Sequence, residues 1–166
     1  MNWLLIIAIL ILIWRIAEGI HRGMVKEIVS FVSLVVLSIA IALVATGIGK
    51  YFEKDFVSMV MVILMLLVLC IVHRLLSLFF FSAKLIAKLP VIHSIDKLLG
   101  AVIGVLETIL LIWTVYSLIM AFGMGMLGEQ ILEYARGSQI LRGLYKYNLL
   151  QTLVEFIAGK LNWLPL

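Results

Sequence analysis

Long runs without a charged residue constrain the fold of this chain more than any other feature of its sequence. Four runs reach 14, 22, 17 and 21 residues, at positions 1–14, 28–49, 56–72 and 108–128. An α-helix needs about 20 apolar residues to cross the hydrocarbon core of a bilayer. The runs therefore predict an all-α integral membrane protein with four transmembrane helices.

The composition excludes other classes of protein. Apolar residues make up 65% of the chain and charged residues 13%, whereas soluble domains have about 45–50% and about 25%. Disordered chains are poor in apolar residues, so disorder is excluded as well. The net charge of +4 comes from 13 Lys and Arg against 9 Asp and Glu. We interpret these charges as topology signals, and we expect no nucleic-acid partner.

The first run is too short to cross a bilayer by itself. At 1.5 Å per residue it reaches about 21 Å, and extension to Ile20 gives about 30 Å. The extension includes Arg15 and Glu18, which lie one turn apart on the same face. Arg15 can therefore pair with Glu18 or reach the interface. A cleaved signal peptide is the competing interpretation, but no Lys or Arg precedes the apolar stretch, as one would in a secretory signal.

The second run contains three serines, Ser30, Ser33 and Ser38. In lipid, the hydroxyl of each can hydrogen-bond the preceding turn of its own helix. The second run therefore predicts a helix in which the serine hydroxyls hydrogen-bond backbone carbonyls of the same helix.

The sequence after the third run predicts how the last two spans are joined. The third span runs on into residues 75–89, which are typical of an interfacial amphipathic helix. The polar side chains there fall near one helical face, opposite Phe and Leu, and they are Arg74, Ser77, Lys84 and Lys88. Pro90 ends this helix, and Ser94 is well placed to cap the next one. Asp96 falls in the first turn of that helix, where a negative charge is favourable. This helix, from about 95 to 122, is the fourth span.

Residues 129–166 form an amphipathic tail after the membrane domain of residues 1–128. Gly137 and Ser138 break the tail, and Ser138 is placed to cap its second piece. One apolar stripe at helical spacing comprises Leu150, Leu153, Val154, Ile157 and Leu161. We expect two short amphipathic helices on the membrane surface, because Glu155 and Lys160 would interrupt a fifth crossing.

Lys and Arg near the short loops predict the orientation in the membrane. Seven of them flank the first and third turns, namely Arg15, Arg22, Lys26, Arg74, Lys84, Lys88 and Lys97. Two flank the second turn, Lys50 and Lys54. Because positive charge is retained on the cytoplasmic side, the first and third turns should be cytoplasmic. Four crossings then place both termini outside the cytoplasm, although further basic residues in the tail weaken the signal.

A first group of candidate functional residues lies at the first turn and comprises Glu18, Gly19, Arg22, Gly23 and Glu27. Glu18 and Arg22 are four residues apart and can form an ion pair. Gly19 and Gly23 have the same spacing and would let two helices approach closely. One interpretation is a glycine-containing helical hairpin held by an ion pair. The other is a partner-binding or ligand-binding site at the cytoplasmic face.

A second group lies on one side of the fourth span and comprises Asp96, Gly100, Gly104 and Glu107. The two glycines form a GxxxG pair, a common packing motif in apolar helices. Glu107 lies within the span, where a carboxylate is costly unless it is paired, protonated or hydrated. We therefore predict that Glu107 faces protein and interacts with Arg22 or Arg15.

The sequence does not indicate a catalytic, metal or cofactor site. His21, His73 and His93 lack the short spacing that is usual for zinc ligands. Cys70 is the single cysteine, which excludes an intrachain disulfide and a cysteine-based metal site. No phosphate loop, metalloprotease motif or nucleophile motif is present. We expect a protein without a cofactor that is not an enzyme.

Two segments together resemble the bacterial colicin V production protein family. They are GIHRGMVKEIVS at residues 19–30 and PVIHSIDKLLGAVIGVL at residues 90–106. The resemblance extends to the four-span layout and the amphipathic tail. It implies a multi-pass protein of the bacterial inner membrane without known catalytic chemistry. The family name ties such a protein to production or export of a peptide toxin, and more broadly to envelope function.

The match to the family's patterns is incomplete at two positions. Gly19, Arg22, Gly23 and Glu27 fit the first pattern, and Asp96, Gly100 and Gly104 fit the second. An acidic residue usual near the start of the first span is replaced by Leu4 and Leu5. A basic residue usual after the second glycine is replaced by Glu107. The resemblance therefore implies no charge pathway through those positions.

Three functions compete at this point. The first is a non-enzymatic membrane protein that supports peptide export or envelope homeostasis through other membrane proteins. The second is a small channel or transporter formed by homo-oligomers, which Glu107 and the glycines of the fourth span would favour. The third, an intramembrane enzyme, lacks convergent nucleophiles, bases or metal ligands in the sequence. In each case the surrounding membrane lipid is a partner of the chain.

Overall fold

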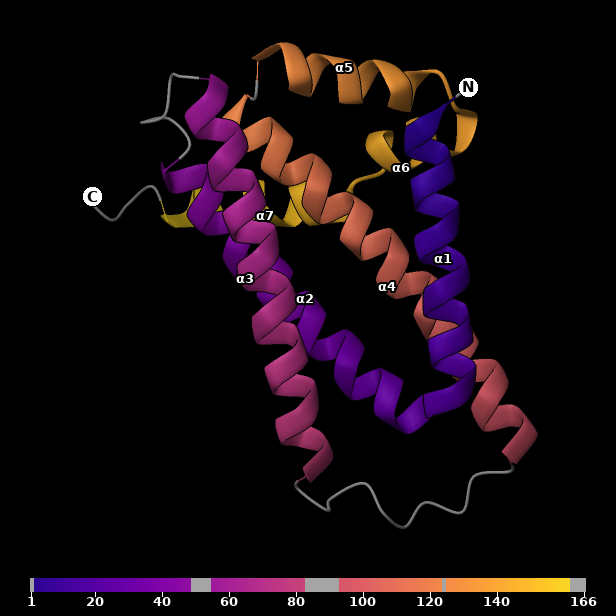
Figure 1. Ribbon diagram of the computed structural model, residues 1–166. Coiled ribbons are helices and arrows are strands. Elements are labelled where there is room, and N and C mark those ends of the chain that lie inside the picture. Colours follow the sequence, from indigo (N-terminus) through magenta and orange to yellow (C-terminus); the bar gives the residue numbers. More distant parts are fainter. Residues whose placement is uncertain (1, 49–54, 83–92, 124, 162–166) are drawn as a thin grey trace.

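The computed structural model describes residues 2–48, 55–82, 93–123 and 125–161, and in this part of the chain it is all-helical. Its helices, in chain order, are α1 (Trp3–Arg22), α2 (Met24–Ile48), α3 (Asp55–Ser82), α4 (His93–Phe122), α5 (Gly125–Arg136), α6 (Gln139–Lys146) and α7 (Leu149–Leu161). Four long helices form the bundle, and three shorter ones follow (Figure 1). The predicted all-α fold is confirmed for these residues.

Among the described residues, three helices are long and apolar enough to cross a membrane. They are α1, the Met24–Gly47 part of α2, and the Ile95–Phe122 part of α4. In α3 the apolar stretch found among the described residues is Val60–Leu76, which is shorter. The structure thus supports membrane-spanning helices, and the count of four spans stays a prediction.

The joints of α3 and α4 differ in part from the sequence prediction. Residues 75–82 continue α3 without a break, as expected for a third span that runs on into this segment, and the interfacial placement of the segment stays a prediction. The rest of that predicted helix and Pro90 lie outside the described residues. Because α4 begins at His93, Ser94 lies inside its first turn instead of capping it. Asp96 is in the first turn, as predicted.

Helix α4 is the centre of the packing, because both α1 and α2 lie against it, while α3 packs mainly on α2. Helices α1 and α4 run side by side in opposite directions (Figure 1). One apolar core joins α2, α3, α4 and α7 through Leu34, Ala42, Leu69, Leu110, Leu150 and Val154. A second core joins Ala45, Val62, Leu118, Ile119 and Phe122 nearer the C-terminal end of α4. These side chains gain dispersion energy by packing between the helices.

The described part of the tail contains three helices where two were predicted. The break at Gly137 and Ser138 is confirmed, but Ser138 makes no side-chain capping hydrogen bond. Helix α5 begins at Gly125, ahead of the predicted domain boundary after residue 128. A second break precedes α7, where Asn148 Oδ1 accepts a hydrogen bond from the Gln151 N–H at 3.0 Å. Asparagine is common at this capping position, because its side-chain oxygen accepts a hydrogen bond from an N–H of the first turn that has no backbone carbonyl partner.

Helices α6 and α7 pack along the sides of the bundle, and the place of the tail on the membrane surface stays a prediction. Trp113 Nε1 donates to the Leu144 carbonyl at 2.9 Å, and Asn148 Nδ2 donates to the Trp113 carbonyl at 3.2 Å. Trp113 lies nine residues before the end of α4, which is about 14 Å along the helix axis. By contrast, α5 crosses the end of the bundle beside the start of α1, where Asn2 Nδ2 donates to the Tyr134 carbonyl at 2.6 Å (Figure 1).

Candidate functional site

Glycines bring the backbones of α1 and α4 into direct contact. A Cβ atom added to Gly19 would collide with the Gly100 carbonyl, and one added to Gly100 would collide with the Gly19 carbonyl. A Cβ at Gly104 would lie 2.5 Å from the Arg15 carbonyl oxygen. Gly19, Gly100 and Gly104 therefore act as packing positions, because any side chain would separate the two helices.

Gly23 has a second role besides the close helix approach predicted for it, which the nearness of its backbone to Gly100 confirms. It follows the last residue of α1 with a φ of 79°, a conformation that side chains disfavour. A Cβ there would also collide with the Asp96 carboxylate. Asp96 Oδ1 accepts a hydrogen bond from the Met24 N–H at 2.8 Å. Asp96 of α4 thus caps the start of α2, a contact between residues far apart in the sequence.

An ion-pair chain connects α1 with the interior of α4. Arg15 Nη2 contacts Glu107 Oε2, and Arg15 Nη1 lies 2.8 Å from Glu18 Oε2. Arg22 pairs with the other oxygen of Glu18. Glu107 is 0% exposed and Arg15 is 8% exposed. The prediction that Glu107 faces protein is confirmed, and its partner is Arg15, not Arg22.

The glycine contact and the ion pair depend on each other. The Arg15 backbone lies against Gly104, and Glu107 follows Gly104 by three residues on the same side of α4. Close approach of the backbones therefore lets the Arg15 guanidinium reach the Glu107 carboxylate. A buried carboxylate without a cationic partner would be strongly disfavoured.

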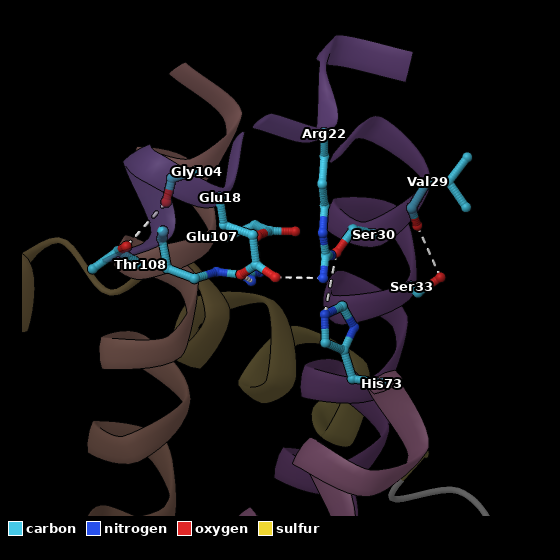
Figure 2. A network of polar contacts seen from close by, with 10 residues as sticks. Glu18, Arg22, Val29, Ser30, Ser33, His73, Gly104, Glu107 and Thr108 are labelled. Atoms are coloured by element: carbon cyan, nitrogen blue, oxygen red, sulfur yellow. Dashed lines mark hydrogen bonds and ion pairs between the residues drawn. The ribbon is translucent and has the colours of Figure 1, made fainter. Parts of the chain in front are cut away.

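The serines of α2 behave in two ways. Ser33 Oγ donates to the Val29 carbonyl at 2.9 Å, as predicted. Ser30 Oγ instead lies 3.2 Å from His73 Nε2 of α3 (Figure 2). Ser38 Oγ accepts a hydrogen bond from the Thr114 hydroxyl of α4 at 3.0 Å. The prediction of bonds within the helix is therefore wrong for Ser30 and Ser38, which join α2 to its neighbours.

Glu27 is the remaining member of the first predicted group. It is 1% exposed, and neither carboxylate oxygen has a hydrogen-bond partner among the described residues. Ser30 and His73 lie about one turn further along the same region of α2 and α3. Sequence spacing indicated Glu18 with Arg22 but gave no sign that Glu27 would be fully buried.

A cavity of about 640 Å³ lies among α1, α2 and α3. Its charged lining includes Arg15, Glu18 and Arg22 from α1, and Arg74 beside His73 from α3. In Figure 2 the side chains of Glu18, Arg22 and His73 point toward one another from these helices. The sequence placed Arg74 at the third turn, but it did not reveal that Arg74 and His73 line the same cavity as the ion-pair chain.

The predicted group therefore divides by role. Gly19, Gly100 and Gly104 pack α1 on α4, Asp96 and Gly23 form the turn between α1 and α2, and the charged residues line or flank the cavity. In the part of the chain that the structure describes, no three His, Cys, Asp or Glu residues are grouped as metal ligands. The side chain of His93 lies outside the described set.

Long apolar helices held together by glycine contacts and an interior ion pair define a helical membrane protein. The chain belongs to the Colicin V production protein family, whose model matches residues 5–147. This range includes both segments that carried the resemblance. No curated protein and no solved structure matches the chain.

Proposed function

We propose that this protein is a non-enzymatic, four-span protein of the bacterial inner membrane. It supports production or export of a peptide toxin, or envelope homeostasis, by binding other membrane proteins. The observation that carries the proposal is the family match over residues 5–147, because the family is described by colicin V production.

The arrangement of the polar side chains favours a structural role for this protein over a catalytic one. Asp96 bonds the start of α2, and Glu107 pairs with Arg15 of α1. Both carboxylates are thus engaged with neighbouring helices, where they fix the register of the bundle. A general acid or base would need to reach a bound substrate instead.

The proposed orientation places both termini outside the cytoplasm and the turn between α1 and α2 inside. Its support is the excess of Lys and Arg near the first and third turns. The charged end of the cavity, with Arg22 and Arg74, would then face the cytoplasmic leaflet.

Complementation and cross-linking test the proposed function. In a bacterial strain that secretes colicin V and lacks its own member of the family, expression of this chain should restore toxin in the medium. Cross-linking in native membranes followed by purification should recover specific partner proteins. A chain that restores toxin while purifying without any other protein would contradict the partner-based role.

An oligomeric channel or transporter is the second candidate, and the cavity favours it. Ionisable residues inside membrane helices commonly mark ion or substrate pathways, and Arg15 and Glu18 line this cavity. Flux across liposomes that contain only the purified protein would support transport. Absence of flux for protons, common ions and small solutes would remove this candidate without affecting the first.

A further inference from the structure

The cavity among α1, α2 and α3 has a charged end and an apolar end. Along α1 its lining extends from Ile11 to Arg22, about 16 Å at 1.5 Å per residue. Its volume of about 640 Å³ is in the range of small-molecule sites, about 300–1,000 Å³. The cavity is therefore large enough to hold part of an amphiphilic molecule.

The charged end has an excess of positive charge. Among the described residues that line the cavity, four are cationic, Arg15, Arg22, Lys26 and Arg74, and one, Glu18, carries a carboxylate. Arg15 is held by Glu107 and Glu18. Arg22 is 41% exposed, so its guanidinium keeps donors that its contact with Glu18 does not use. Arg74 is exposed and makes no ion pair or hydrogen bond with another described residue.

The apolar end is open toward the surroundings of the bundle. Buried Leu34 and Leu69 are part of its lining. The two sides of its opening are formed by Trp14 of α1, which is 65% exposed, and Ile71 of α3, which is 50% exposed. In the described residues α1 and α3 are not a packed helix pair. In a membrane, the opening between them would face lipid acyl chains.

We propose that this cavity binds an anionic phospholipid of the bilayer. The phosphate lies at Arg22 and Arg74, and an acyl chain follows Trp14 and Leu69 toward the apolar end. Guanidinium groups match phosphate oxygens in charge and geometry. Basic pockets between transmembrane helices on the cytoplasmic side are suited to anionic headgroups. This inference does not depend on the proposed role in toxin production.

Charge decides between a lipid and a protein helix as the occupant. An apolar helix from a partner or a second copy could cover Trp14 and Ile71, but it would leave the Arg74 guanidinium without an anion. A phospholipid supplies both the apolar chain and the anionic group in one molecule.

Native mass spectrometry of the purified full-length protein tests the site. With equal amounts of phosphatidylglycerol and phosphatidylcholine added, the protein should retain one phosphatidylglycerol in preference. Arg74→Gln should weaken this retention about fivefold, and Arg22→Gln should weaken it as well. Lys97→Gln is the matched control, because Lys97 is an exposed cation of α4 outside the cavity lining. It should retain lipid like the wild type.

Each alternative result would overturn the proposal. Equal retention of the two lipids, or equal loss in Lys97→Gln and Arg74→Gln, would indicate nonspecific charge attraction. Because Arg74 makes no ion pair or hydrogen bond with another described residue, Arg74→Gln should keep the elution profile of the wild type. Unchanged retention of lipid by this variant would therefore also overturn the proposal. Cys70, the single cysteine, lines the cavity. A photo-cross-linker on Cys70 should capture lipid in native membranes, and predominant capture of a polypeptide would assign the cavity to a protein partner.

Discussion

Loss of Arg15 should destabilise the protein much more than loss of Arg22, because the two arginines differ in burial. Arg15 is 8% exposed and pairs with Glu107, which is 0% exposed. Arg15→Met would leave that carboxylate uncompensated in the bundle, at a cost of about 3–5 kcal/mol in the free energy of unfolding. Arg22 is 41% exposed, so Arg22→Met should cost less than about 1 kcal/mol.

A double-mutant cycle separates the ion pair from the other effects of each substitution. Glu107→Met alone leaves Arg15 with Glu18, so it should cost less than Arg15→Met. The double variant Arg15→Met/Glu107→Met should recover about 2–3 kcal/mol of the summed losses. The assay is denaturant unfolding in detergent micelles, followed by helical circular dichroism. If the loss in the double variant equals the sum of the two single losses to within about 0.5 kcal/mol, the two side chains do not interact.

Three further predictions concern packing, capping and topology. Gly100→Leu and Gly104→Leu should reduce the yield and melting temperature of folded protein. Gly47→Leu should not, because a Cβ at Gly47 has no neighbour within 4 Å. Equal effects of all three substitutions would contradict the helix-contact interpretation. Asp96→Ala should lower the free energy of unfolding by about 1 kcal/mol, because the cap of α2 is lost. Asp96→Asn keeps an acceptor and should lower it by less. A wild-type melting curve for Asp96→Ala would show that Asp96 does not stabilise the start of α2. After Cys70→Ser, a cysteine in place of Lys54 should react with an impermeant maleimide from outside the cytoplasm, and labelling only from the cytoplasmic side would overturn the topology.

Features that depend on spacing within one helix could be predicted from the sequence. Three of the four charge-free runs correspond to described helices of spanning length, and the spacing of Glu18 and Arg22 predicted their ion pair. The same reasoning placed Glu107 against protein, because a lipid-facing carboxylate in a span is costly. These inferences need only helix geometry and the free energy of charge in lipid.

Contacts between distant helices could not be predicted in the same way. Arg15 and Arg22 both lie near the end of α1, and only the approach of α1 to α4 decides which one reaches Glu107. Likewise, nothing local distinguishes Ser33, which bonds its own helix, from Ser38, which bonds Thr114. The sequence offers donors and acceptors, and the packing of the helices selects among them.

The tail shows the same limit from another direction. Its amphipathic stripe predicted helices with one apolar face, but amphipathicity does not say whether that face covers lipid or protein. In the structure Leu150 and Val154 are buried against the bundle, and Asn148 bonds Trp113 and caps α7. The signal available in the sequence was Asn148 itself, a good cap residue directly before an apolar stripe.

Helix α4 determines how α1 and α2 are placed, because one of its sides carries three different interactions in succession. Asp96 holds the start of α2, Gly100 meets Gly19, and farther along Glu107 reaches Arg15. Since α1 runs antiparallel to α4 (Figure 1), a shift of α1 by one turn would break the backbone contact and the ion pair together. Neither interaction alone specifies this register, because glycine contacts tolerate sliding and an arginine side chain is long. The two interactions together specify the register of α1 on α4. They thereby fix the side of the cavity that α1 forms, where Arg22 faces α3.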